Sequence, residues 1–139
     1  MSDCIDTSVL VAAMVATEAH HAKCAALLNR KGPGIYTHGL AETFSTLTGG
    51  KKPFRMPAVL AAALIEEDYL PDLTTTSLTS AEMLRAMREA ESRGVRGGAI
   101  FDYLHLVAAR KAKAARLYTL NLSHFRAFHR PGDPEIVHP

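Results

Sequence analysis

Cysteine is scarce in this chain, and long apolar runs are absent. Cys4 and Cys24 are too few for a disulfide framework and lack the C-x-x-C spacing of a zinc or redox site. The longest uninterrupted apolar stretch, Val9 to Ala16, is much shorter than the roughly 20 residues that span a bilayer. Asp3 and Asp6 are acidic where a secretory signal would be basic. The sequence therefore predicts a cytoplasmic protein without a membrane segment.

A strong excess of one charge is also missing. The formal net charge is +2, which by itself indicates neither a nucleic acid nor an acidic partner. Apolar residues make up 47% and charged residues 22% of the chain, as in ordinary globular proteins rather than disordered ones. The length of 139 residues predicts one domain over residues 1–139.

Short β-type segments alternate with helical patterns along the chain. We expect strands at residues 3–6, 35–37, 69–74, 116–120 and 135–137. We expect a first helix that is capped by Thr7-Ser8 and ends at Met14, and a second that is capped by Thr17 and ends at Asn29. Further helices are expected at 40–47, 57–68 and 79–93, and after Gly98. Strands separated by helices favour parallel pairing with crossovers, so the predicted fold is α/β, a three-layer α/β/α sandwich with a mainly parallel sheet.

Two of these helices carry further detail. Thr79 to Glu82 forms a capping box, and the helix that it starts ends at Gly94, with a stripe made of Ala81, Leu84, Met87 and Ala90. The helix after Gly98 is expected to bury one face, made of Ile100, Phe101, Leu104, Val107 and Ala108.

Acidic and amide side chains follow the predicted strands. Asp6 comes after the first strand, Glu42 lies in the first turn of the helix after the second strand, and Asn121 follows the strand that ends at Leu120. Asp102 joins them if the first turn of its helix points to the same edge. Because reactive groups of parallel α/β sheets collect at the carboxyl ends of the strands, we expect these four side chains at one rim.

Such a cluster requires a counter-charge. Carboxylates about 5 Å apart repel one another by roughly 3 kcal/mol per pair at an effective dielectric constant near 20, so a cation or raised pKa values must compensate. Oxygen ligands alone favour Mg²⁺ or Mn²⁺ over Zn²⁺, and such a centre suits phosphodiester hydrolysis. We expect Thr7, Ser8 and Thr119 to hydrogen-bond the carboxylates or a metal-bound water.

Four segments resemble the PIN-domain ribonucleases, and among them the VapC-type toxins of VapBC toxin–antitoxin pairs. They are IDTSVLV at 5–11, LAETF at 40–44, FDYLHLVAA at 101–109 and TLNLSHF at 119–125. The resemblance implies a homodimeric endoribonuclease that uses Mg²⁺ or Mn²⁺, cleaves single-stranded or loop regions of RNA, and is inhibited by a VapB-like antitoxin. It also implies that Asp6, Glu42, Asp102 and Asn121 are the catalytic set. Asn121 departs from the commonest pattern, which has Asp there, so we expect it to be the weaker ligand.

Several residues carry weaker hypotheses. RNA or antitoxin contacts are predicted for two groups of residues. The first group is the loop residues Lys51, Lys52, Phe54 and Arg55, and the second is the arginines along one helix and its exit, Arg85, Arg88, Arg93 and Arg96. The alternative for both groups is a solvated charged surface. His105 lies about 100° around the helix from Asp102, which favours a structural role over a general base. No role is assigned to His124.

Other interpretations stay open. Asp6 could only cap a helix, Asp102 could only complement a helix dipole, and Asn121 could be a turn residue. A haloacid-type phosphatase fits poorly because it needs D-x-D and this chain has D-x-x-D. A phosphoryl-accepting receiver domain shares the α/β plan, but this chain has a helical Glu after its second strand, and its late strand ends in Asn121 rather than in a lysine. A PIN-like domain that binds RNA or protein without cleavage is favoured only by Asn121.

Overall fold

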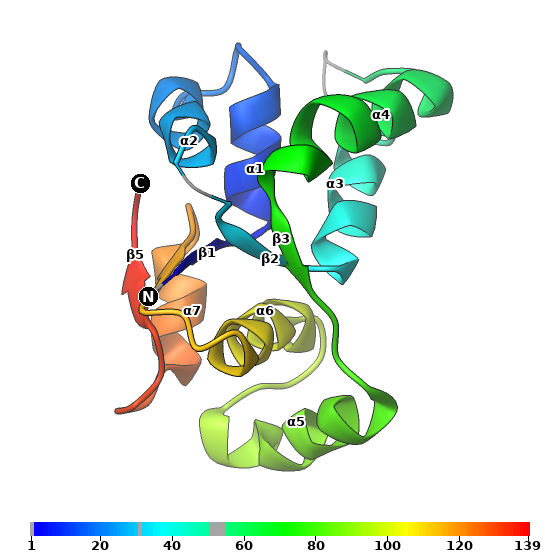
Figure 1. Cartoon of the computed structure of the whole chain (residues 1–139). Helices are drawn as coiled ribbons and strands as arrows, with labels where there is room; N and C mark the ends of the chain where they lie inside the picture. Colours follow the sequence, from blue (N-terminus) through cyan, green and yellow to red (C-terminus); the bar gives the residue numbers. More distant parts are fainter. Residues whose placement is uncertain (1, 31, 51–54) are drawn as a thin grey trace.

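The computed structural model of the protein describes residues 2–30, 32–50 and 55–139. Five short strands form one sheet in the order β3-β2-β1-β4-β5, and every neighbouring pair is parallel (Figure 1). The strands are β1 (Asp3–Ile5), β2 (Gly34–Tyr36), β3 (Thr74–Thr76), β4 (Arg116–Tyr118) and β5 (Glu135–Val137). The parallel sheet is confirmed, and β1 lies at its centre with Asp6 directly after it.

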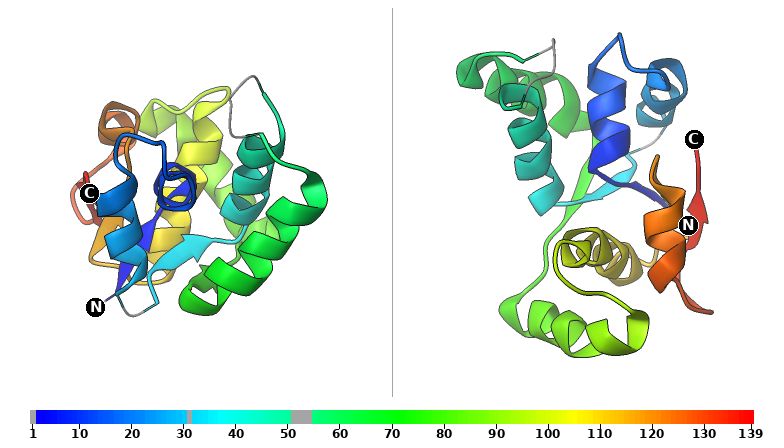
Figure 2. Two further views of the ribbon diagram at one scale, coloured as in Figure 1. Left: turned by 90° about the horizontal axis from the view of Figure 1, so that it is seen from above. Right: turned by 180° about the vertical axis from the view of Figure 1, so that it is seen from behind.

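Helices cover both faces of the sheet, which confirms the three-layer α/β/α sandwich. Alternate residues of a strand point to opposite faces. Cys4 packs in one core cluster with α6 and α7, whereas the next residue, Ile5, packs in another with α1 and α2. Figures 1 and 2 show α1 to α4 on one side and α5 to α7 on the other. The helices are α1 (Thr7–Met14), α2 (His21–Leu28), α3 (His38–Thr48), α4 (Ala58–Leu64), α5 (Ser80–Arg93), α6 (Ala99–Lys111) and α7 (Leu122–Phe128).

Two predicted helix starts were wrong. The N-cap of α1 is Asp6, whose Oδ1 accepts from the backbone N–H of Val9 at 3.2 Å, so Thr7 and Ser8 are helical residues. The second helix begins at His21 rather than at Thr17, because the chain makes a turn there with His21 N–H bonded to the carbonyl of Glu18. The ends of both helices agree with the expected ones to within a residue.

The region from Pro57 to Thr76 also differs from expectation. Pro57 is the N-cap of α4, and α4 continues as a π-helical segment, Ile65–Tyr69, and a 3₁₀ turn, Leu70–Asp72. The third strand therefore begins at Thr74, the last residue of the predicted segment 69–74, because the helical turns continue to Asp72. The edge strand at 135–137 is confirmed.

The capping box of α5 is confirmed. Thr79 Oγ1 accepts from the N–H of Glu82, Glu82 Oε1 accepts from the N–H of Thr79, and Gly94 ends the helix with φ of +72°. The apolar stripe of this helix is not core, because Leu84 and Met87 are about half exposed. Ala86 is the buried residue of α5.

The helix after Gly98 buries most of its expected face, with one clear exception. Leu104, Val107 and Ala108 are buried in the core beside β4, as predicted. Phe101 is 50% exposed, so its placement on the buried face was wrong. Phe101 lies in the first turn of α6, and its ring stacks on the ring of His38 in α3 instead of entering the core. Within the described ranges, no helix is long and apolar enough to cross a membrane.

Candidate active site

Asp6 is a buried carboxylate held at both oxygens. It has 2% relative exposure. Ser8 Oγ donates to its Oδ1 at 2.6 Å, and Thr119 Oγ1 donates to its Oδ2 at 2.6 Å. With the cap bond from Val9, Asp6 therefore both caps α1 and ties the end of β1 to the end of β4. A buried carboxylate needs such hydrogen-bond donors whether or not it also binds a ligand. The observed hydrogen bonds therefore fit both the capping interpretation and the site interpretation of Asp6.

Glu42 lies one turn inside α3, not in its first turn, because α3 begins at His38. Its Oε1 accepts from Thr7 Oγ1 at 3.0 Å and lies 2.8 Å from Nε2 of His105. An ionised carboxylate only accepts, so Nε2 of His105 is the donor. Burial raises the pKa of Glu42, but the hydrogen bonds and charge of His105, with Thr7 and His38, outweigh burial and lower it below its usual value. Glu42 is therefore held ionised.

Asp102 occupies the first turn of α6, as predicted, and is partly buried. Burial raises its pKa above the usual value, and the negative charge of Asp6 raises it further, against smaller opposing effects of His105 and His124. Asp6 and Asp102 lie on separate elements but border the same hollow, so their negative charges repel each other. The exposed ring of His124 places Nδ1 3.5 Å from Oδ2 of Asp102.

Asn121 precedes α7 as its N-cap residue. Its backbone carbonyl accepts the first bonds of the helix, and its N–H donates to Oγ1 of Thr119 at 2.9 Å. Its side chain makes no capping hydrogen bond, so the cap does not use the amide group. The amide of an exposed Asn121 is thus available for another contact.

Three of the four predicted residues line one hollow. Asp6, Asp102 and Asn121 share a hollow of about 340 Å³ at the carboxyl ends of β1 and β4. Thr7 and Ser8 also line it. Glu42 does not border this hollow, but it is bonded to Thr7, which does. The strand-end rule therefore placed Asp6, Asp102 and Asn121 together, and put Glu42 beside them through Thr7.

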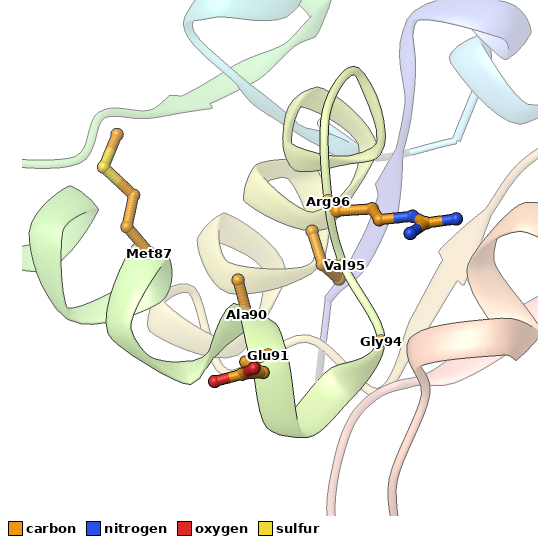
Figure 3. Close-up of a pocket in the computed structure, with 6 residues that line it drawn as sticks. All are labelled: Met87, Ala90, Glu91, Gly94, Val95 and Arg96. Atoms are coloured by element: carbon orange, nitrogen blue, oxygen red, sulfur yellow. The ribbon is translucent and has the colours of Figure 1, made fainter.

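Asp102 also borders a second hollow of about 380 Å³ between α6 and α7, where His124 and Ser123 supply the polar groups. A third, about 670 Å³, lies beyond Gly94 and is lined by α5 and the loop after it; Figure 3 shows Met87 and Arg96 among its residues. Gly94 borders both of these hollows. Neither Asp6 nor Asp102 borders the hollow of about 670 Å³, so that hollow lies outside the candidate active site.

The donor atoms at the site fit a hard divalent cation in kind, because the carboxylates of Asp6 and Asp102 and the amide of Asn121 all offer oxygen. Across the part of the chain that the structure describes, however, no group of three or more His, Cys, Asp or Glu side chains is arranged to hold a metal ion. A complete ligand set around Mg²⁺ or Mn²⁺ therefore stays a prediction, and waters or a substrate phosphate would have to complete it.

The sequence interpretation gave His105 a structural role without linking it to Glu42, and it assigned no role to Glu18. His105 is 3% exposed, bonds Glu42, and leaves its Nδ1 without a hydrogen-bond partner among the described residues. Its place one turn after Phe101 gave no hint of Glu42, which is distant in sequence. Glu18 lines the hollow of Asp6 from the turn after α1. The sequence pattern around Glu18 gives no sign of a site.

The predicted basic contacts have mixed outcomes. Lys51, Lys52 and Phe54 lie outside the described residues, while Arg55 is exposed. Arg85 and Arg88 are exposed on α5, away from the hollow of Asp6. Arg93 is paired with Asp133 at 2.5 Å, so its guanidinium already has a partner within the fold. The RNA or antitoxin roles of all these residues stay predictions.

The comparisons with known proteins agree on one family. Residues 4–129 match the protein family described as "PIN domain". The chain is 32% identical to Ribonuclease VapC27 of Mycobacterium tuberculosis over 110 residues, covering 79% of this chain and 78% of the relative. It is also 32% identical to Ribonuclease VapC40 of M. tuberculosis over 128 residues, covering 90% of each.

Two solved structures share the fold. One is M. tuberculosis VapC20, described as a Sarcin-Ricin loop cleaving toxin, with a TM-score of 0.73, 23% identity, and coverage of 99% of this chain and 100% of that one. The other is VapBC2 from Rickettsia felis bound to a DNA fragment from its promoter, with a TM-score of 0.69, 18% identity, and coverage of 100% and 99%. The family match over residues 4–129 and the VapC relatives together show that the chain belongs to the PIN-domain family, within its VapC-type toxin ribonucleases.

Proposed function

We propose that this chain is an endoribonuclease dependent on Mg²⁺ or Mn²⁺ that cleaves single-stranded or loop regions of RNA. The observation that carries the proposal is the hollow in which Asp6 and Asp102 lie together with the amide of Asn121. RNA as the substrate is supported by relatives named ribonucleases and by a structural neighbour described as cleaving the Sarcin-Ricin loop.

We assign Asp6 and Asp102 as metal ligands, with Asn121 as a weaker one. The raised pKa of Asp102, caused by burial and by Asp6, is the electrostatic cost that a bound cation would relieve. Glu42 uses Oε1 for Thr7 and His105, so we assign its other oxygen to the metal or to a water on it. When bound, Mg²⁺ or Mn²⁺ would polarise the scissile phosphate and lower the pKa of the attacking water.

The residues around these acids hold them in place. Ser8 and Thr119 fix both oxygens of Asp6, while Thr7 and His105 fix Glu42. Donors already oriented by the fold reduce the ordering cost when substrate arrives, which is the ordinary role of groups behind metal ligands. The fixed carboxylates would then hold the cation at one place in the hollow.

We also propose that the protein acts as the toxin of a toxin–antitoxin pair, as a homodimer inhibited by a VapB-like antitoxin. A structural neighbour is a VapBC complex, which supports the antitoxin. Val59 is 83% and Leu60 48% exposed on α4, and this apolar surface supports a contact between two copies. The cytoplasmic location and the single domain over 1–139 stay predictions.

The test is incubation of purified protein, freed of any partner, with single-stranded and structured RNAs, with and without Mg²⁺. We expect cleavage of single-stranded regions only when metal is present, and its loss in Asp6→Asn. Asp3→Asn is the matched control, because Asp3 begins the same strand and pairs with Arg116 at the opposite end. RNA binding without cleavage would favour the non-cleaving PIN-like alternative, and cleavage in chelator would contradict the proposal.

A further inference from the structure

Two aromatic rings lie exposed beside the acids and have no evident role in the core. Phe101, which directly precedes Asp102, is 50% exposed, and His38 at the start of α3 is also exposed. Their ring centroids are 6.1 Å apart, and their planes are within 21° of parallel. The two rings thus form an exposed stacked pair, which we call the His38–Phe101 pair.

The His38–Phe101 pair lies close to Glu42 because its two residues belong to the same helices, α3 and α6, as Glu42 and His105. His38 and Glu42 are four residues apart on α3, and Phe101 and His105 are four residues apart on α6. Residues at this spacing lie on one helix face, about 6 Å apart along the axis. The exposed His38–Phe101 contact therefore lies one helical turn from the half-buried Glu42–His105 hydrogen bond of 2.8 Å.

Tyr36, the last residue of β2, contacts both the exposed His38 and the buried His105. Its ring is 6.0 Å from that of His38 and 5.5 Å from that of His105, with the second contact edge-to-face. Tyr36 is itself buried. The His38–Phe101 pair therefore packs against a buried aromatic residue. This contact with the core, rather than a loop, sets the position of the pair relative to Glu42.

A single exposed phenylalanine is common on protein surfaces and needs no function. The His38–Phe101 pair differs because a second exposed ring lies nearly parallel to it, and because both residues lie within one turn of proposed catalytic acids. Planar exposed rings are the surface on which unpaired bases of single-stranded RNA stack, and such stacking tolerates any base. Phe101 directly precedes Asp102, which borders the hollow of Asp6, so the pair lies one residue along α6 from the proposed phosphate site.

We propose that the His38–Phe101 pair is a stacking platform for an unpaired nucleobase next to the phosphodiester that is cleaved. This inference rests on the proposed function and extends it to substrate recognition. It explains why single-stranded or loop RNA would be preferred, since a base in a duplex is already stacked and cannot reach the platform.

The probe is a short single-stranded oligoribonucleotide that carries the fluorescent base aminopurine at one position at a time, with chelator present to prevent cleavage. Stacking quenches aminopurine, so wild-type protein should quench it at one position. Phe101→Leu keeps apolar volume but removes the ring. It should abolish the quench and weaken binding about tenfold, as expected for the loss of one base stack. His38→Ala should act in the same direction.

The controls separate stacking from folding. Phe101→Trp should retain the quench, because it restores an aromatic face on the same exposed helix position. Leu84→Ala, a half-exposed apolar residue on α5, should leave both quenching and affinity unchanged. Circular dichroism should show the same helix content in all variants.

Two results would overturn the proposal in different ways. If wild-type protein cleaves single-stranded RNA with metal but Phe101→Leu binds and quenches as wild type does, the platform is wrong and the nuclease assignment stands. If wild-type protein neither binds nor cleaves any RNA, both the platform and the proposed function are wrong.

Discussion

The hydroxyl of Thr119 donates a 2.6 Å hydrogen bond to Oδ2 of Asp6 where both residues are almost fully buried. Thr119 follows β4 and Asp6 follows β1, and these neighbouring strands are paired in parallel. The same hydroxyl accepts from the N–H of Asn121. One side chain thus fixes the position of a proposed metal ligand and begins the turn that leads to another.

Thr119→Val tests this arrangement because valine has nearly the same shape without the hydroxyl. Oδ2 of Asp6 and the N–H of Asn121 both lose a partner in the interior, so we expect the free energy of unfolding to fall by about 1–3 kcal/mol. Urea unfolding measures the loss, and Thr119→Ser should recover most of it. Unchanged stability in Thr119→Val would contradict the role of this hydroxyl.

Glu42 and His105 should behave as a coupled pair. Each single variant, Glu42→Leu or His105→Leu, removes the hydrogen bond, so the double variant should cost less than the sum of the two. We expect a coupling energy of roughly 1–2 kcal/mol in a double-mutant cycle measured by urea unfolding. Additive losses would mean that the 2.8 Å contact does not stabilise the fold.

Asn121→Asp should strengthen metal binding if the amide faces the cation. The variant adds one negative charge to the hollow of Asp6 and Asp102, and its side chain is not committed to the helix cap. Calorimetry with Mn²⁺ should therefore show a higher affinity than in the wild type, by about tenfold for an added charge interaction of roughly 1.4 kcal/mol. An unchanged Mn²⁺ affinity would place Asn121 outside the ligand set.

Asp133 gives the fold a measurable pH dependence. Burial raises the pKa of Asp133, but hydrogen bonds from Arg93 and from the N–H of Arg130 outweigh burial, so its pKa lies below the ordinary value of 3.8. A carboxyl with a lowered pKa contributes stability that is complete above the unfolded value and is lost as the pH falls through the folded value. Asp133→Asn should cost roughly 2 kcal/mol near neutral pH.

The measurement for Asp133 is urea unfolding of both proteins near neutral pH and in acid. The difference between the wild type and Asp133→Asn should shrink in acid, because both side chains are then uncharged. Glu135→Gln, an exposed acid on β5, is the control and should change little at either pH. An equal difference at both pH values would show that the ion pair with Arg93 is not the source of the stability.

The sequence predicted the parts of this fold that local chemistry determines. The capping box of Thr79 and Glu82 and the stop at Gly94 depend only on neighbouring residues, and both are confirmed. The parallel sheet followed from the alternation of strands and helices. The strand-end rule brought Asp6, Asp102 and Asn121 to one hollow without any knowledge of distances.

Features that depend on distant partners were not predictable in this way. The α7 helix, Leu122–Phe128, was missed because a seven-residue segment after a turn-favouring Asn carries a weak pattern, and its stability comes from Phe125 and Phe128 packing on α6. Phe101 was placed in the core because periodicity cannot show that its ring lies against the ring of His38, a residue of α3. The bond between His105 and Glu42 joins residues from α6 and α3, which only the folded chain brings together.

The central claim is that carboxylates at the end of the sheet hold a metal that cleaves RNA. Asp102 is the most direct place to test it, because its partly exposed side chain can change with less risk to the fold than buried Asp6. The measurement is the rate of single-stranded RNA cleavage over a range of Mg²⁺ concentrations. We predict that wild-type protein requires Mg²⁺ and that Asp102→Asn lowers the rate about a hundredfold or more while remaining folded. Cleavage by wild-type protein in chelator, or a wild-type rate in Asp102→Asn, would contradict the claim.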